Sequence, residues 1–241
     1  MARDLSIVIP SFNEAAHVEK VLGDWIGVCQ RLGIDFEITI YDGGSTDSTP
    51  DIIRTTMQAN APGRVVLKIL PGVPHGPSIL QGYREASANW IFQMDSDDAY
   101  GTSAFEELWR RRDEYDLLLG CRTGRPTNWS RRFVTRCGRL AIRAIFNSKV
   151  ADANTPYRLM RRSAIVDLLR IVPDNALVPN VLLSGLAGSA GLRLYQIEVV
   201  DAGAPVGTAR LASFRLGRVA LRSFAQLIRV RWNERQRRAA G

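Results

Sequence analysis

Short apolar runs that alternate with helical patterns are the feature that most constrains how this chain can fold. The runs that predict strands are Leu5–Ile9, Phe36–Tyr41, Arg64–Leu70, Trp90–Met94, Asp116–Gly120 and Arg193–Val200, the last an edge strand. The segments that predict helices are 18–29, Thr49–Ala59, Pro77–Ala88, Ser103–Arg112 and Leu177–Leu186. Alternation of this kind favours an α/β fold, in which a mostly parallel sheet is flanked by helices. With 241 residues, 46% of them hydrophobic, the chain can bury one sizeable core.

Carboxylates follow the expected strand Trp90–Met94 where its apolar run stops. Asp95 and Asp97 lie two residues apart in this turn. The carboxyl end of a central strand is where open α/β sheets bind ligands. Because hard divalent cations prefer oxygen ligands and bridge carboxylates to phosphate, the turn predicts a site for Mg²⁺ or Mn²⁺. The alternative is a solvated turn, since turns favour Asp.

Polar turns also follow the first two expected strands. The first strand runs into Pro10–Glu14, and the second runs into Asp42–Asp47, which contains two glycines. Carboxyl ends of parallel strands share one edge of a sheet, so both turns are expected beside the acidic turn, in a nucleotide-type site. The alternative is that Asp42 and Asp47 form the turn and cap the next helix.

Three blocks together resemble a known family. IVIPSFNE, YDGGSTDST and MDSDD, with a Gly-led helix before the last, are similar to the inverting family 2 glycosyltransferases of the GT-A fold, a Rossmann-like α/β fold. The resemblance covers about the first half of the chain. The nucleotide-binding positions that it implies are Pro10, Glu14 and Asp42, with Asn13 and Asp47 as neighbours. Asp95 and Asp97 would bind metal and the donor diphosphate, so Asp95 is expected to contact the nucleotide as well.

A second segment narrows the resemblance. Asp152-Ala-Asn-Thr-Pro-Tyr-Arg158 resembles, by spacing, the Asp-x-x-x-Gly-Phe-Arg segment of polyprenyl-phosphate sugar transferases of the dolichyl-phosphate mannose synthase type. Arg122 stands where the family often has Gly-x-Arg. The resemblance therefore implies that Arg122 and Arg158 join Asp95 and Asp97 in catalysis.

The chain also departs from this group. Pro156 replaces the usual Gly, and Ala99 stands where a Gln or Glu near the metal is expected. The His-Arg pair that carries the phosphate-contacting Arg is missing after residue 200. Whether Arg210 takes its place is left open.

Basic residues are concentrated in two segments of a chain whose formal net charge is +8. Arg122–Lys149 holds eight basic residues and no acid. Phe214–Arg238 predicts a basic amphipathic helix, within an extension (211–241) that follows a catalytic domain over 1–210. On a helical wheel, Arg215, Arg218, Arg222 and Arg229 lie opposite Leu216, Ala220, Leu221, Phe224, Leu227 and Ile228. Such a helix is typical of an anionic membrane surface, although its apolar face could instead pack on the domain.

The residues and the resemblance together predict a metal-dependent inverting glycosyltransferase. The expected donor is a GDP- or UDP-sugar, and the expected acceptor is a polyprenyl phosphate at the membrane surface. A lipid phosphate is already ionised near neutral pH, which agrees with the absence of a recognisable Glu-Asp base motif. Two alternatives stay open: transfer to a sugar or protein hydroxyl, and a non-catalytic sugar-nucleotide-binding adaptor.

Other sequence features bear on location and partners. The chain lacks an apolar run of about 18 residues and a signal-peptide pattern, which favours a cytoplasmic protein, peripheral at the inner face of the membrane. Three scattered cysteines predict free thiols. No nucleic-acid-reading motif accompanies the basic segments, so nucleic acid is not an expected partner. The sequence does not determine the oligomeric state.

Overall fold

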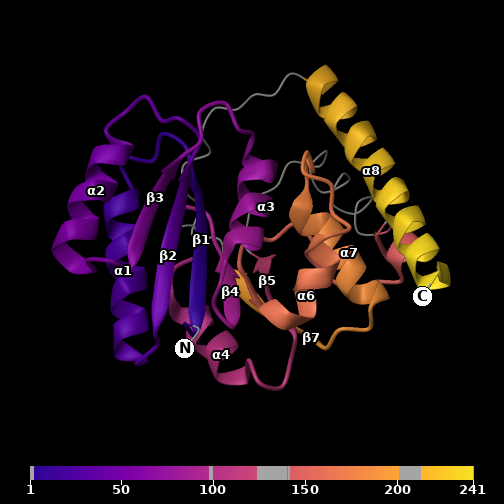
Figure 1. Cartoon of the computed structure of the whole chain (residues 1–241), viewed down its shortest axis with the longest axis horizontal. Coiled ribbons are helices and arrows are strands. Elements are labelled where there is room, and N and C mark those ends of the chain that lie inside the picture. Colours follow the sequence, from indigo (N-terminus) through magenta and orange to yellow (C-terminus); the bar gives the residue numbers. More distant parts are fainter. Residues whose placement is uncertain (1–2, 98–99, 124–139, 141, 201–212, 241) are drawn as a thin grey trace.

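A seven-stranded sheet with helices on both faces forms the protein (Figure 1). The computed structural model describes residues 3–97, 100–123, 140, 142–200 and 213–240, and the side chains of 222–236 in the last helix. The strands are β1 (Leu5–Ser11), β2 (Phe36–Asp42), β3 (Val65–Ile69), β4 (Trp90–Gln93), β5 (Leu117–Thr123), β6 (Arg158–Arg161) and β7 (Leu194–Val200), in the order β3-β2-β1-β4-β6-β5-β7. This confirms the predicted α/β class and the predicted strands, including β7 at the edge, within about three residues at their ends.

The strand β6 was not predicted. It lies between β4 and β5 and is antiparallel to both, with Gln93 opposite Arg158. Its four residues, RLMR, have arginine at both ends, so they show no apolar run. Because β6 runs against β4, its first residue lies at the carboxyl end of β4, beside the acidic turn.

Two layers of helices cover the sheet. One layer holds α1 (Val18–Arg31), α2 (Thr49–Asn60) and α4 (Ser103–Arg111), and the other holds α3 (His75–Glu85), α6 (Arg162–Leu169), α7 (Pro179–Ser189) and α8 (Ser213–Ala240). Alternate strand residues face the two layers: Ile7 and Ile9 lie in the first core and Val8 lies in the second. Of these helices, α6 was not predicted.

The helix α8 runs along the outer side of α7 (Figure 1). Leu227 and Val230 are buried in the second core, at 6% and 2% exposure. Phe224, Ile228 and Trp232, spaced four residues apart, are 43%, 50% and 63% exposed. The prediction of one apolar face was therefore wrong in part, because the apolar residues divide between the domain and the outside. Among the described residues, no helix combines the length and apolar character needed to cross a bilayer.

Gly82 brings α3 close to the sheet. A Cβ atom at this position would lie 2.3 Å from Cγ1 of Val8 and 3.0 Å from Cε2 of Tyr41. Both neighbours are buried, at 1% and 2% exposure, so neither can move aside freely. The absence of a side chain at Gly82 thus sets the distance between α3 and the β1–β2 pair.

We expect Gly82→Ala to lower the free energy of unfolding by about 1–3 kcal/mol, because overpacking outweighs the better helix propensity of Ala. The matched control is Gly23→Ala in α1, where an added Cβ meets nothing within 4 Å. This control should raise the free energy of unfolding by up to about 1 kcal/mol. Urea denaturation measures both, and a stabilised Gly82→Ala variant would contradict the close packing.

Candidate active site

The carboxyl ends of β1, β2 and β4 meet at one edge of the sheet, as predicted, because β1 pairs in parallel with both neighbours. Hydrogen bonds join the loops that follow β1 and β2. The Asn13 backbone N–H donates to Ser45 Oγ (2.8 Å), and Asn13 Oδ1 accepts from the Thr46 N–H (2.9 Å). The Glu14 N–H donates to Thr49 Oγ1 (2.8 Å). Asn13 adopts a left-handed backbone (φ 56°), which Asn tolerates better than most residues.

Asp42 and Asp47 hold the β2 loop in shape. The Asp42 side chain has no exposed surface, and its Oδ1 accepts from the Gly44 and Ser45 N–H groups at 2.9 and 2.8 Å. Asp47 Oδ1 accepts from the hydroxyl and the N–H of Thr49, and the hydroxyl is the larger cause that lowers the pKa of Asp47. The alternative, that these acids form the turn and cap the next helix, is thus supported by their contacts: Asp42 binds the turn and Asp47 binds the first residue of α2. Both carboxylates anchor the backbone of the loop between β2 and α2.

Asp95, Asp97 and Glu14 gather negative charge at this edge. Burial, and then the charge of Asp97, raise the pKa of Asp95 to about 7, while Arg122 and Arg158 act in the opposite direction. Burial and Asp97 also raise the pKa of Glu14. The Asp95 side chain is still 32% exposed, so it remains open to a ligand. Crowded carboxylates of this kind are stabilised by a bound cation.

The residues present fit a divalent cation that is shared with a phosphate. Within the described part of the chain, no three His, Cys, Asp or Glu side chains are arranged as a metal site. Mg²⁺ is commonly held by one or two carboxylates together with phosphate oxygens and water, which is what Asp95 and Asp97 offer. Nearby, Ser11 Oγ is buried at the end of β1 without a hydrogen-bond partner among the described residues. Pro10 lies beside it, and its carbonyl accepts from the Ser96 hydroxyl (3.1 Å).

The two predicted arginines differ in position. Arg122, at the end of β5, donates from Nε and Nη2 to both oxygens of Asp152, at 2.6 and 2.9 Å. Arg158 has no exposed surface, and its guanidinium donates to backbone carbonyls, including those of Ala153, Thr155 and Asn180. Arg158 lies opposite Gln93 in the pairing of β4 with β6, and its charge acts to lower the pKa of Asp95 although its side chain has no exposed surface.

Three side chains at the site were missed by the sequence analysis. His75, at the start of α3, places Nε2 3.9 Å from Asp95 Oδ1. Gln93, the last residue of β4, donates to Asp95, and Tyr83 contacts Gln93 from α3. His75 could have been noticed as a histidine in the Gly-led helix block, whereas nothing in the sequence indicates the other two.

Some predictions fall outside the described residues. The residues concerned are Ala99, Arg210 and the part of the basic segment over 124–139 and 141.

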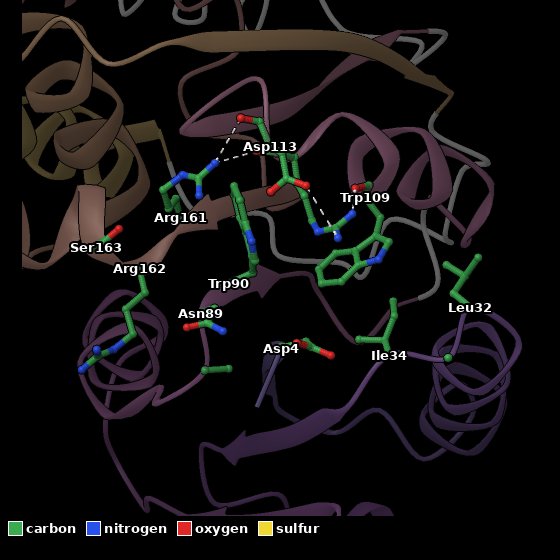
Figure 2. Close-up of a pocket in the computed structure, with 13 residues that line it drawn as sticks. Asp4, Leu32, Ile34, Asn89, Trp90, Trp109, Asp113, Arg161, Arg162 and Ser163 are labelled. Carbon is green, nitrogen blue, oxygen red and sulfur yellow. Dashed lines mark hydrogen bonds and ion pairs between the residues drawn. The ribbon is translucent and has the colours of Figure 1, made fainter. Parts of the chain in front are cut away.

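A cavity of about 520 Å³ lies at the other end of β4, away from these residues (Figure 2). Trp90, Trp109, Arg112 and Arg161 are among its lining residues. The Arg161 guanidinium lies 4.5 Å from the centre of the Trp90 ring, and that of Arg112 lies 4.3 Å from Trp109. These cation–π contacts lie at the edge of the sheet where β4 begins. None of the predicted site residues lines this cavity.

We expect Asp97→Asn to lower the pKa values of both Asp95 and Glu14 in metal-free protein, because it removes a like charge that raises both. Carboxyl-carbon NMR titration in EDTA measures the two values. Asp51→Asn, an exposed acid of α2 paired with Arg54, is the control and should leave them unchanged. Unchanged pKa values in Asp97→Asn would mean that the three carboxylates do not share one site.

Comparisons with known proteins agree with this geometry. The family model described as glycosyl transferase family 2 matches residues 6–169. The undecaprenyl-phosphate 4-deoxy-4-formamido-L-arabinose transferase of Serratia proteamaculans is 25% identical over 217 residues, which is 89% of this chain and 64% of that protein. The Edwardsiella ictaluri transferase of the same name is 26% identical over 215 residues, 88% of this chain and again 64% of its own length. The chain therefore spans less than two thirds of the length of these relatives.

Solved structures show the same fold. Glucosyl-3-phosphoglycerate synthase from Mycobacterium tuberculosis, determined with Mn²⁺ and UDP-glucose, superposes with a TM-score of 0.68 at 19% identity, covering 95% of this chain and 79% of that one. This likeness confirms the predicted GT-A type of fold. The family match extends over well more than half of the chain and includes every acidic residue of the candidate site. This chain belongs to glycosyl transferase family 2.

Proposed function

We propose that this chain transfers a sugar from a nucleotide-sugar donor to a polyprenyl phosphate, with inversion at the anomeric carbon and with Mg²⁺ or Mn²⁺ bound. The observation that carries the proposal is the pair Asp95 and Asp97, which lies beside two loops that are hydrogen-bonded to one another. The chain that carries this site is a member of family 2. The names of the similar bacterial proteins, which are undecaprenyl-phosphate sugar transferases, support the acceptor class.

The donor would lie across the ends of β1, β2 and β4. Pro10, Glu14 and Asp42 border its base and ribose end, and the joined loops offer backbone groups held in one conformation. Asp95 and Asp97 would hold the metal ion, which when bound stabilises the negative charge of the diphosphate leaving group. Arg122 adds a cation on the same side, since its charge reaches Asp95.

The acceptor chemistry decides which further groups are needed. A lipid phosphate is ionised near neutral pH, so it attacks without a general base and needs cations to guide it. A sugar hydroxyl would need a carboxylate within hydrogen-bond reach of its proton. We assign no general base, and the phosphate acceptor is therefore the proposal. Transfer to a hydroxyl and donor binding without transfer are the two outcomes that would replace it.

The exposed side of α8 supports a place at the membrane surface. Phe224, Ile228 and Trp232 form an outward apolar row, because residues four apart lie on the same side of a helix. Arg222, Arg229 and Arg235 are exposed around this row. Leu227 and Val230 meanwhile hold the helix on the domain, so the row is presented by a packed helix. Apolar and arginine side chains on one surface suit the boundary of an anionic bilayer.

For the reaction, we expect Asp97→Ala to abolish sugar transfer and leave the urea midpoint unchanged, because a partly exposed loop acid is removed and the core is untouched. The assay is a panel of UDP- and GDP-sugars with Mn²⁺ or Mg²⁺, with and without polyprenyl phosphate. Asp51→Ala is the control and should transfer normally. Full activity of Asp97→Ala, or full activity in excess EDTA, excludes the metal-dependent mechanism. Better use of a free sugar than of a lipid phosphate supports the hydroxyl acceptor instead.

For the membrane, we expect the triple variant Phe224→Ser, Ile228→Ser, Trp232→Ser to bind anionic liposomes at least about tenfold more weakly, because each side chain loses part of a burial worth about 1.5–3 kcal/mol. Flotation at low salt measures binding, and wild-type binding should weaken at high salt.

The matched control replaces Val66 and Ile69 of β3 by Ser, since these are similarly exposed at 43% and 44%. Point variants test the exposed row alone. Removal of α8 would also expose the core residues that pack against Leu227 and Val230. Equal losses in the triple variant and the control, or no binding by the wild type, would refute the membrane role of α8.

A further inference from the structure

A chain of buried polar side chains leads from α7 and α3 to the carboxylate of Asp95. Gln93, Tyr83 and Asn180 are 0%, 1% and 4% exposed. Gln93 Nε2 donates to Asp95 Oδ1 at 3.3 Å, and Asn180 Nδ2 donates to Gln93 Oε1 at 3.0 Å. The Tyr83 hydroxyl lies 2.6 Å from Asn180 Oδ1 and 3.1 Å from Gln93 Oε1. Three separate elements thus converge behind one acid.

The donors and acceptors fix which way each side chain in this series of hydrogen bonds is turned. Burial raises the pKa of Tyr83, so its hydroxyl stays protonated and donates to Asn180 Oδ1. Asn180 must then present its NH₂ group to Gln93, whose oxygen accepts it. The Gln93 amide cannot turn over without placing two oxygens together, so its NH₂ group always faces Asp95.

The polar chain occupies a place where apolar residues would be expected. It lies between the sheet and the layer that contains α3 and α7, next to Ile79, Leu182 and Leu183 of the second core. Buried polar side chains in such a layer are costly unless each is hydrogen-bonded. Here the bonds end on a carboxylate of the candidate site. Among the described residues, Asp95 Oδ1 receives this bond and Oδ2 accepts none.

We infer that Gln93 is a positioning residue, oriented by Asn180 and Tyr83, that holds Asp95 through Oδ1 and would leave Oδ2 to bind the metal ion. The inference rests on the proposed function of Asp95 as a metal-binding residue. Groups that orient a metal-binding carboxylate in this way typically change metal affinity by about 10–100-fold when they are removed. Gln93 does not touch the donor in this assignment, because it has no exposed surface.

The test measures Mn²⁺ binding by electron paramagnetic resonance on the 241-residue chain, with UDP or GDP present, together with kcat and the Mn²⁺ concentration for half-maximal transfer. Gln93→Leu should weaken Mn²⁺ binding about 10–100-fold, and Tyr83→Phe should weaken it about two- to fivefold, since Asn180 still restrains Gln93. Tyr83→Phe removes a single oxygen and carries the test if Gln93→Leu does not fold. Ser148→Ala, which removes another buried hydroxyl of this layer bonded to the Ser184 carbonyl, is the control and should lower only the urea midpoint.

The outcomes separate the inference from the proposed function. Wild-type Mn²⁺ affinity in both Gln93→Leu and Tyr83→Phe, with binding lost in Asp97→Ala, overturns the positioning role and leaves the metal site in place. Absence of Mn²⁺ binding in the wild type with either nucleotide overturns both. Weakened binding in the Gln93 and Tyr83 variants, with normal binding in Ser148→Ala, supports the inference.

Discussion

Parallel pairing of β1 with β2 on one side and β4 on the other is the constraint on which the site depends. It brings three strand ends to one edge, so that the turns beginning at Pro10, Asp42 and Asp95 become neighbours. The bonds of Asn13 and Glu14 to the β2 loop and the start of α2 then join two of these turns. For the proposed donor, loops that are bonded to one another would reduce the ordering cost of binding.

The antiparallel strand β6 adds Arg158 to this edge of the sheet. A parallel strand at that position would have carried Arg158 to the far end of the sheet, whereas β6 begins beside Gln93. The guanidinium then binds carbonyls of the loop that precedes β6, and its charge reaches Asp95. A buried cation without a carboxylate partner is costly. Its charge acts against burial and Asp97, which together still raise the pKa of Asp95.

The same face of the sheet connects the candidate active site with α8. Asn180, which belongs to the polar chain behind Asp95, is on α7, and α8 packs along α7 through the second core. The outward row Phe224, Ile228 and Trp232 and the acidic edge are thus carried by one packed unit. A membrane contact through that row would hold the site at a constant distance from a lipid acceptor.

The sequence by itself determined the α/β class, the strands other than β6, most helices and the three polar turns, because local periodicity and turn chemistry depend on consecutive residues. It missed β6, whose four residues show no apolar run, and α6, a helix of only eight residues. It also placed Phe224 and Leu227 on one face, since a helical wheel does not show which side a neighbour covers. Only the tertiary structure decided that Arg158 is buried and that Gln93 faces Asp95. The residue that orients Gln93 and also binds Arg158 is Asn180, which is far from Gln93 in the chain, so no local pattern encodes this arrangement.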